Sequence, residues 1–357
     1  MEQILVPARD TSADTLPFSF GGSGREYFGI WIVNLLLTLV TLGIYSAWAK
    51  VRRLQYFYRH TAVAGSSFDY HAKPWSILKG RLIAFALLVA YQGAARTSPR
   101  LYLLVLILLA LLAPLLLYNA QRFRLHYSSW RGIRFGFDGS LGRAYAVVLG
   151  WGLLSLVTLT LLAPLFRANL KRWQHGRARL GSARFEFDAE DLPFFAIYWK
   201  TLGLGLLVLT ASIGWALVVA SPLAHLMNLS GPRGAFNAGV VAGYLIFLLG
   251  MWLLVLPFSN ARYGNLIWSH TLLAGRRLGC RLSAQRLAAL YATNLLGIVL
   301  TLGLFTPWAV IRVLRYRIDC LSLEGTGGLD DIQALAGGEV GALGMEALGV
   351  FDFDLGF

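Results

Sequence analysis

The sequence contains few charged residues for its length. Asp, Glu, Lys and Arg make up 14% of the 357 residues, whereas soluble globular domains contain about 25%. Six long segments contain none of these four residue types, and each holds about 18 or more mostly apolar residues, enough to cross a membrane as a helix. These segments are 27–49, 101–121, 144–166, 201–232, 234–261 and 287–311, and a shorter one covers 82–95. This pattern excludes a soluble protein and predicts a polytopic membrane protein.

Cysteine is also scarce, and residues typical of chemical sites do not cluster. Cys280 and Cys320 are the only cysteines, which is too few for a disulfide framework or a cysteine metal site. The six histidines have no Cys, Asp or Glu at metal-ligand spacing. No His-Glu-x-x-His, phosphate-loop or Gly-x-Ser-x-Gly motif is present. We therefore expect no metal, no cofactor and no enzymatic activity.

Acidic residues are rare over most of the chain, which gives it a strong positive charge. All 32 Lys and Arg residues lie within 1–317, together with ten of the 18 acids, whereas residues 318–357 hold eight acids and no base. Lys and Arg collect on the cytoplasmic side of membrane spans, where they contact anionic lipids. No nucleic-acid-binding motif accompanies the charge. The expected partners are membrane lipids, mainly anionic ones, and not nucleic acid.

Two distant segments share a pattern of polar as well as apolar residues. Residues 34–56 read NLLLTLVTLGIYSAWAKVRRLQY, and residues 294–316 read NLLGIVLTLGLFTPWAVIRVLRY. Both contain an Asn, a Thr-Leu-Gly and a Trp-Ala-x-x-Arg in the same places, which common apolar composition does not explain. A more divergent third copy covers 159–175, where Lys171 replaces the Arg. The sequence therefore predicts internal pseudo-repeats.

A second pattern recurs as a glycine followed by alternating apolar residues. It occurs at 65–70, 132–138 and 181–188, and more weakly at 275–282. Alternation with a period of two next to glycine predicts a short strand or hairpin with one buried face. We expect short cytoplasmic β elements beneath the membrane; the alternative is an amphipathic loop in the head-group layer.

The positions of the basic connectors suggest a topology. The connectors 50–81, 119–143, 167–200 and 260–286 are all basic, so the positive-inside rule places them in the cytoplasm. Segments 82–118 and 198–259 satisfy this rule as helical hairpins. Segment 144–166 joins two basic connectors, so a single crossing would put one of them outside.

Breaks within the repeated segments offer a solution to this conflict. Gly43, Pro164 and Gly303 interrupt the three apolar segments, and broken helices occur at membrane depth where protein or a watery cavity covers them. We therefore predict an all-α polytopic membrane protein with four full spans and three broken or re-entrant segments. The alternative is seven simple spans that violate the charge rule locally.

The predicted organisation has three parts: an N-terminal cytoplasmic segment (1–24), a repeat-built membrane domain (25–323) and an acidic C-terminal tail (324–357). Both termini are expected in the cytoplasm.

Several of these motifs together resemble one known family. The opening FSFGGSGREYFGIW, the segment TLGIYSAWAKVRR, the Phe-x-Phe elements and the final FDFDLGF are similar to the YjgN-like bacterial inner-membrane proteins, a group of unknown function. The resemblance covers nearly the whole chain. It implies a multi-pass protein of the bacterial inner membrane, and it implies no particular reaction.

Five aromatic and basic residues are candidates for binding a lipid head group. Trp48, Arg52, Trp308 and Arg312 occupy matching places in two copies, and the simple explanation is an interfacial Trp beside an Arg that reaches toward the head groups. The alternative is that the arginines converge with Lys171 on one phosphate or anionic amphiphile.

The matching residues Asn34 and Asn294 are the main polar candidates within the apolar segments. They either form hydrogen bonds between helices, worth about 0.6 kcal/mol in a membrane, or line a small polar cavity.

Two functions fit this sequence. The first is transport or handling of a lipid or anionic amphiphile through a cavity at the broken helices. The second is a non-catalytic membrane scaffold or regulator that binds partners through its cytoplasmic face.

Overall fold

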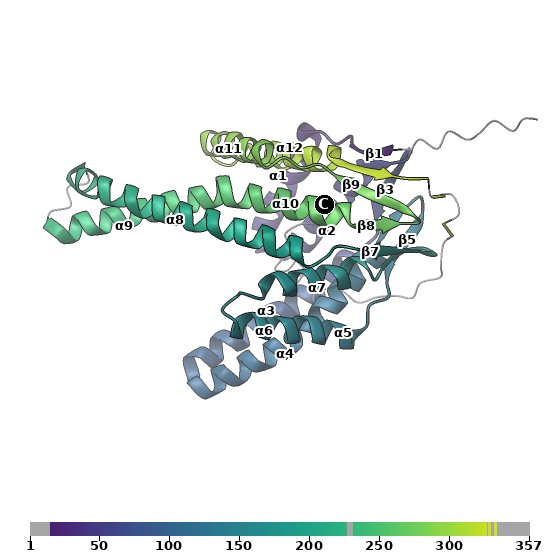
Figure 1. Cartoon of the computed structure of the whole chain (residues 1–357), viewed down its shortest axis with the longest axis horizontal. Coiled ribbons are helices and arrows are strands. Elements are labelled where there is room, and N and C mark those ends of the chain that lie inside the picture. Colours follow the sequence, from purple (N-terminus) through teal and green to yellow (C-terminus); the bar gives the residue numbers. More distant parts are fainter. Residues whose placement is uncertain (1–14, 227–230, 327, 330–331, 334–357) are drawn as a thin grey trace, which may run out of the picture.

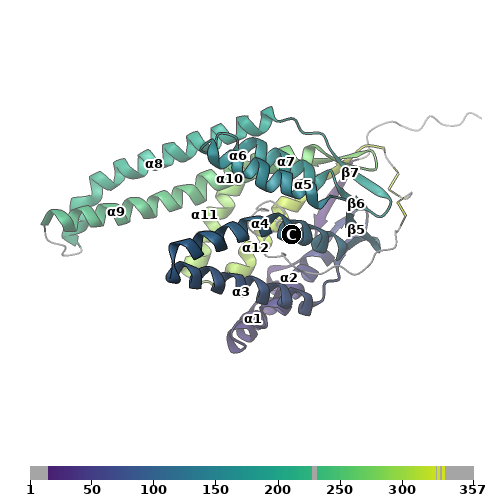
Figure 2. The same cartoon turned by 90° about the horizontal axis from the view of Figure 1, so that it is seen from below.

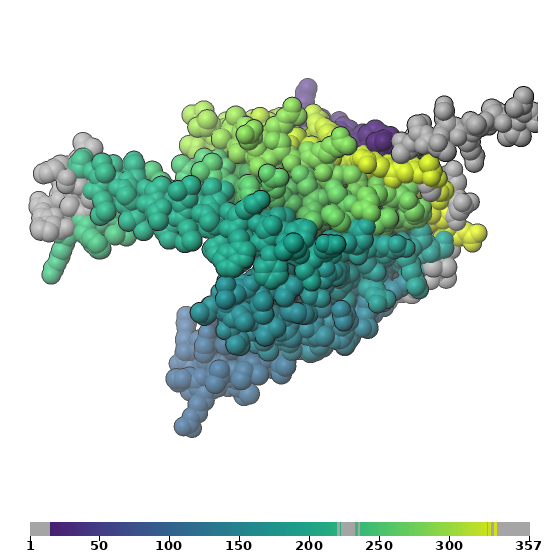
Figure 3. Space-filling model, in the orientation of Figure 1, coloured from purple at the N-terminus to yellow at the C-terminus, as the bar shows by residue number. Residues whose placement is uncertain are grey.

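The structure combines a small β-barrel with a set of helices that extend from one side of it (Figure 1). The computed structural model describes residues 15–226, 231–326, 328, 329, 332 and 333. Residues 1–14 and most of the predicted acidic tail therefore lie outside the described residues. In the space-filling view, one helical hairpin projects far beyond the others (Figure 3).

Ten short strands form a closed antiparallel barrel in the order β1-β10-β9-β8-β7-β6-β5-β4-β3-β2. The predicted all-α class is therefore wrong, because every repeated glycine element is half of a hairpin whose edges are paired on both sides. The strands are β1 (Thr15–Phe20), β2 (Thr61–Val63), β3 (Ser66–Tyr70), β4 (Ser128–Trp130), β5 (Ile133–Phe137), β6 (Ala178–Leu180), β7 (Ala183–Phe187), β8 (Thr271–Leu273), β9 (Arg276–Cys280) and β10 (Leu321–Glu324).

Four hairpins repeat one design, in which a three-residue strand and a five-residue strand flank a two-residue turn. In three of these turns both residues have positive φ: Ala64 (49°) and Gly65 (71°), Arg131 (50°) and Gly132 (75°), Ala274 (50°) and Gly275 (76°). Two successive positive φ angles define a type I′ turn, whose twist matches that of the paired strands. Glycine tolerates this conformation without steric cost, which explains the glycines that the sequence pattern contains.

The two ends of the described chain complete the barrel. Thr15–Pro17 of β1 pair with β10, and Phe18–Phe20 pair with β2. Strands β10 and β1 thus form a fifth pair that resembles the other hairpins but has no connecting turn. As a result, the described part of the predicted N-terminal segment belongs to the barrel.

Helical hairpins connect the successive strand pairs. They consist of α1 (Gly24–Val40) with α2 (Ser46–Arg59); α3 (Pro74–Thr97) with α4 (Pro99–His126); α5 (Leu141–Tyr145), η1 (Ala146–Trp151) and α6 (Gly152–Val157) with α7 (Ala163–His175); α8 (Leu192–Leu226) with α9 (Gly231–Gly250), η2 (Met251–Val255) and α10 (Leu256–Ser269); and α11 (Ala284–Leu300) with α12 (Thr306–Asp319). Serine caps begin several of these helices; Ser98, for example, accepts a hydrogen bond from the Leu101 N–H and separates α3 from α4.

The same backbone hydrogen bond recurs between neighbouring strand pairs. The N–H group that follows each long strand donates to the carbonyl that precedes the next short strand, over 2.8–3.1 Å. The donor and acceptor residues are Gly21 and His60, His71 and Tyr127, Asp138 and Arg177, Asp188 and His270, and Arg281 and Cys320. The unit of helix, strand pair and helix therefore recurs around the barrel with one geometry.

Four of the described helices are long and apolar enough to cross a membrane: Pro74–Thr97, Pro99–His126, Leu192–Val219 and Phe236–Ser269. Their number agrees with the four full spans predicted from charge and length. They form the two long hairpins, α3–α4 and α8–α10, which correspond to the segments 82–118 and 198–259.

Each of the three segments predicted to be broken consists of two helices joined by a tight turn. The turns contain Leu42 and Gly43, Leu159 and Thr160, or Leu302 and Gly303, all with positive φ. The turn leucines are largely exposed; Leu42, for example, is 94% and Leu302 is 95% exposed. These three short hairpins, α1–α2, α5–α7 and α11–α12, therefore end in apolar tips.

The type I′ turns can be tested with a matched pair of glycine substitutions. No atom lies within 4 Å of a Cβ added at Gly65 in a turn or at Gly29 in α1, but only Gly65 has positive φ. We expect Gly65→Ala to destabilise the protein by about 1–2 kcal/mol, the cost of left-handed backbone for an L-residue. Gly29→Ala should be neutral or stabilising. Thermal unfolding in detergent measures both, and an equal loss for the two variants would contradict the turn assignment.

Candidate ligand cavity between the barrel and the helices

A cavity of about 370 Å³ extends from the inside of the barrel to the bases of α2, α4, α7 and α10. Its volume lies within the usual range for small-molecule sites, about 300–1,000 Å³. Barrels of eight strands have interiors just wide enough for side chains or one small ligand, so a barrel of ten strands leaves more space.

The part of the cavity inside the barrel is enclosed by inward-facing apolar residues, here called the girdle. Because side chains alternate along a strand, one residue of each long strand faces inward opposite one residue of a short strand. The five cross-strand pairs are Phe18 and Val63, Phe68 and Trp130, Phe135 and Leu180, Phe185 and Leu273, and Leu278 and Leu323. Neighbouring phenylalanine rings stack with centroids 6.2–6.3 Å apart. The girdle therefore offers an aromatic and aliphatic surface to an apolar chain.

The part of the cavity next to the helices is lined by polar and basic residues, here called the collar. They come from three helices: Lys50 and Arg53 of α2, Gln121 and Arg124 of α4, and Gln174 and His175 of α7. None of the described lining residues is acidic. Arg124 Nη2 donates to Gln121 Oε1 over 3.3 Å. The collar is therefore suited to an anionic group placed directly above the apolar girdle.

Two buried polar groups of the lining have unused hydrogen-bonding capacity. Gln174 is 1% exposed, and neither its Oε1 nor its Nε2 has a partner. The hydroxyl of the fully buried Tyr70 is also without a partner. Burial, followed by the neighbouring Tyr58, raises the pKa of Tyr70, so its hydroxyl keeps its proton and can donate. An unsatisfied buried polar group costs about 1–3 kcal/mol, and both groups point to a ligand with polar atoms.

The candidates from the first and last repeat copies lie elsewhere. The Trp48 ring contacts Tyr45 and Trp75, and Arg52 Nη1 donates to the Tyr45 hydroxyl over 3.0 Å. The Trp308 ring packs against Phe28 and Phe305. None of these three candidates, Trp48, Arg52 and Trp308, lines the cavity.

Arg312 lies instead beside one of the predicted intramembrane asparagines. Its Nη1 donates to Asn294 Oδ1 over 2.7 Å, and Asn294 Nδ2 donates to the Ala309 carbonyl over 3.2 Å. Asn34 is buried in α1, where its Oδ1 has no partner, and Lys171 is buried in α7. None of these four residues lines the cavity either. Binding of a head group by Lys171 and Arg312, together with Trp48, Arg52 and Trp308, stays a prediction.

The collar residues were missed because they resemble ordinary interfacial cations. Arg53 follows Arg52 directly, but only Arg53 lines the cavity. The distance to the next strand would have identified two of them. Arg124 lies four residues before Ser128, where β4 begins, and Gln174 lies four residues before Ala178, where β6 begins. That spacing places a side chain one turn above the barrel.

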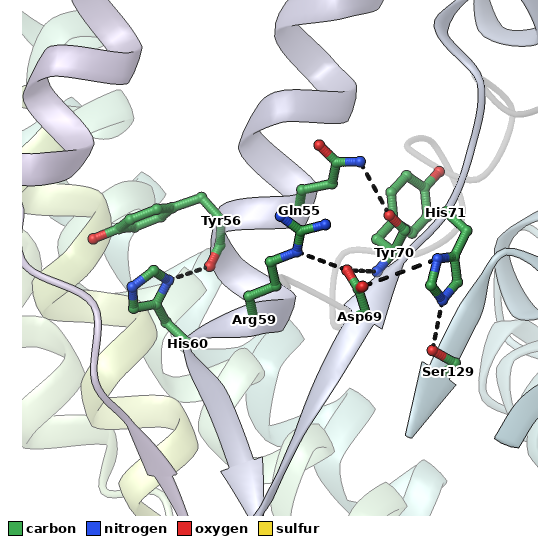
Figure 4. A network of polar contacts seen from close by, with 8 residues as sticks. All are labelled: Gln55, Tyr56, Arg59, His60, Asp69, Tyr70, His71 and Ser129. Atoms are coloured by element: carbon green, nitrogen blue, oxygen red, sulfur yellow. Dashed lines mark hydrogen bonds and ion pairs between the residues drawn. The ribbon is translucent and has the colours of Figure 1, made fainter. Parts of the chain in front are cut away.

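Outside the barrel, a polar network joins α2 to β3 and β4 (Figure 4). Arg59 Nε donates to Asp69 Oδ1 over 2.9 Å, and His71 Nε2 lies 2.7 Å from Ser129 Oγ. Asp69 Oδ2 and His71 Nδ1 are 3.9 Å apart, beyond hydrogen-bond distance. Because Ser129 is only 3% exposed, we interpret this network as a structural link between strand pairs, comparable to the Arg179–Asp138 ion pair.

Comparison with known proteins shows similarity to one family of bacterial proteins and to relatives that are named inner membrane proteins. Residues 15–350 match a family described as bacterial protein of unknown function (DUF898). The chain is 30% identical over 142 residues to the inner membrane protein YjgN of Salmonella typhimurium, covering 40% of this chain and 35% of that protein. It is 33% identical over 127 residues to YjgN of Escherichia coli K12, covering 35% and 31%. The chain thus spans about a third of the length of these relatives. No solved structure matches it.

The unpartnered amide of Gln174 can be tested through stability. We expect Gln174→Met to raise the free energy of unfolding of the delipidated protein by about 1–3 kcal/mol, because it removes two unsatisfied buried atoms. Gln55→Met is the matched control and should lower it, since Gln55 Nε2 donates to the Tyr70 carbonyl over 3.3 Å. Thermal unfolding in detergent measures both variants. A loss of stability in Gln174→Met would mean that the amide is satisfied in solution.

Proposed function

This chain belongs to the DUF898 family of bacterial proteins of unknown function, and we propose that it binds a single-chain anionic amphiphile in its central cavity. Its curated relatives are named inner membrane proteins, and four of its described helices can cross a membrane. The observation that carries the proposal is the basic collar, without a described acid, directly above an apolar girdle.

The proposed ligand follows from the chemistry of the two halves of the cavity. Arginine and lysine form strong, charge-assisted hydrogen bonds with carboxylate or phosphate oxygens, and Gln174 adds an unpaired donor and acceptor beside them. The girdle accepts an alkyl chain, whose transfer from water is favourable. A volume near the lower end of the range for small-molecule sites favours one chain over a two-chain phospholipid.

The proposed topology places the barrel in the cytoplasm. All five helical hairpins extend from the same side of the barrel (Figure 1, Figure 2), so each hairpin begins and ends at the barrel. The basic connectors 50–81, 119–143, 167–200 and 260–286 contain the strand pairs β2–β3 to β8–β9. This arrangement supports a cytoplasmic location for all four connectors and for β1 and β10, in accordance with the positive-inside rule.

In this topology the three short hairpins are re-entrant. Helix α1 has 17 residues, or about 25 Å at 1.5 Å per residue, and its base carries the charged Arg25 and Glu26. Its tip therefore does not reach across a hydrocarbon core of about 30 Å. The exposed leucines Leu42, Leu159 and Leu302 at the tips support insertion into lipid.

We also infer that the recurring unit reflects an internal repeat. Asn34 and Asn294 occupy corresponding helices, α1 and α11, of two short hairpins, and Trp48 and Trp308 occupy their partners, α2 and α12. The matching residues thus occur in matching elements.

The proposal differs in two respects from the function expected from the sequence. The described cavity lies at the bases of the helices and not at their broken tips, and the proposed activity is binding and not transport. A scaffold that binds partners through its cytoplasmic face remains the alternative and makes no use of the cavity.

Single-cysteine labelling tests the topology in a Cys280→Ala, Cys320→Ala background. Cysteines that replace the exposed Arg122, Arg177 and Arg277 should react with an impermeant reagent only from the cytoplasmic side, because each lies in the barrel or near the barrel end of a helix. A cysteine at Arg96, at the turn of the α3–α4 hairpin, is the control and should react from outside. Labelling of position 177 from outside, with position 122 protected, would make 144–166 a full span.

Binding of dansyl-labelled undecanoic acid tests the ligand class. Arg53→Gln should weaken binding about tenfold or more, because a hydrogen bond to a charged group is worth about 1.5–3 kcal/mol and 1.4 kcal/mol corresponds to a factor of ten. The matched control is Arg52→Gln, a neighbouring substitution outside the cavity, which should leave the affinity unchanged. Equal losses in both variants would indicate a surface effect of charge, and no binding to the unsubstituted protein would favour the scaffold.

A further inference from the structure

The two ends of the cavity differ in how far side chains close them, and this difference indicates from which end a ligand enters. At the end away from the helices, two described residues that follow β10 are buried against the barrel. Leu329 and Ile332 pack against the girdle, and each is 8% exposed. Leu329 also lines the cavity. These two side chains, here called the floor, close the barrel with apolar surface.

The floor is attached on the far side of the barrel. Ser182, in the turn between β6 and β7, donates its N–H to the Gln333 carbonyl over 2.9 Å, and the Gln333 N–H donates to Ser182 Oγ over 3.0 Å. In the barrel order, three strands separate β10 from β6, so Gln333 is held on the opposite side of the barrel from β10. Gly181 allows this approach, since a Cβ at this position would collide with the Gln333 carbonyl oxygen.

The collar end is open by comparison. Arg53 lines the cavity although its side chain is exposed, whereas the girdle residues Val63 and Leu180 are buried. The collar lies at the bases of α2, α4 and α7, and the hairpins formed by these helices end in exposed apolar residues such as Leu42 and Leu159. The open end therefore faces the layer where head groups of a membrane would lie.

From these observations we propose that the cavity takes its amphiphile from the membrane leaflet next to the barrel, and that the floor closes the cavity to cytoplasmic water. This inference rests on the proposed function for the identity of the ligand, but the access route can be tested without a ligand. An amphiphile in that leaflet already has its head group at the depth of the collar. Its apolar chain then enters the girdle without contacting bulk water, because Leu329 and Ile332 exclude water from below.

The experiment uses two thiol reagents on the full chain in inverted membrane vesicles, with Cys280 and Cys320 replaced by alanine. Val63→Cys provides a reactive group in the girdle, and Ser67→Cys provides an exposed control on the outer part of β3. One reagent is a charged, water-soluble methanethiosulfonate, and the other is a maleimide on a dodecyl chain, delivered in the lipid. We expect the charged reagent to modify Val63→Cys at least tenfold more slowly than Ser67→Cys, while the dodecyl maleimide modifies Val63→Cys readily.

Opening the floor should reverse this protection. We expect Leu329→Ser combined with Ile332→Ser to increase the rate of the charged reagent at Val63→Cys at least tenfold. Gly181→Ala is a second variant that displaces Gln333 and leaves both floor side chains unchanged, and it should have the same effect. Labelling of Ser67→Cys should not change in either variant, which controls for delivery of the reagent, and an unchanged thermal unfolding transition controls for loss of the fold.

Three results would overturn the inference: rapid reaction of Val63→Cys with the charged reagent when the floor is intact, no effect of either floor variant, or no reaction with the lipid-borne maleimide. These results are independent of the proposed function. If access follows the prediction but dansyl-labelled undecanoic acid does not bind, the route stands and the ligand class is wrong. If the probe binds through Arg53 but water reaches Val63→Cys freely, the ligand class stands and the route is wrong.

Discussion

The pairing of β1 with β10 is the interaction on which the rest of this structure depends. Strands of three to six residues are too short to be stable as isolated hairpins, and an open sheet would leave unpaired backbone groups at both edges. Thr15–Pro17 and Ser322–Glu324 remove both edges by pairing across the two ends of the described chain. Closure also creates an enclosed interior, so the cavity exists only because this pair forms.

A closed barrel determines how the helices must run. Each strand pair begins and ends on the same side of the barrel, so every helical connection has to leave and return on that side. The chain therefore forms hairpins of different length without changing the barrel: α8 has 35 residues, whereas α1 has 17. This constraint also explains the conflict in the charge pattern around 144–166. Both neighbouring connectors belong to the barrel, and the segment between them returns to it.

The sequence predicted features that depend on neighbouring residues and missed those that depend on distant pairing. The long hairpins were predictable because their apolar runs lie between basic connectors, and the long strands were predictable because Phe135 and Phe137, for example, alternate after Gly132. The short strands were not predictable, since three residues such as Thr61–Val63 are too few to show an alternating pattern. Closure of the barrel was not predictable, because residues far apart in the sequence, such as Leu278 and Leu323, face each other only after the whole chain has folded. The same holds for the collar, where only the neighbouring helices distinguish Arg53 from Arg52.

The collar is where the recurring unit stops being equivalent around the barrel. Four residues before the first strand residue, the inner helices carry Phe57, Arg124, Gln174, Ile267 and Arg317 in turn. Thr61, Ser128 and Thr271 each donate a side-chain hydrogen bond to the carbonyl four residues earlier, so the backbone geometry there is the same. The girdle, by contrast, is apolar all round. A binding site with a defined polar side therefore arises because α4 and α7 carry Arg124 and Gln174 where α10 carries Ile267, and because α2 adds Lys50 and Arg53 from earlier turns. A ligand bound in the cavity would be oriented by these residues and not by the barrel itself.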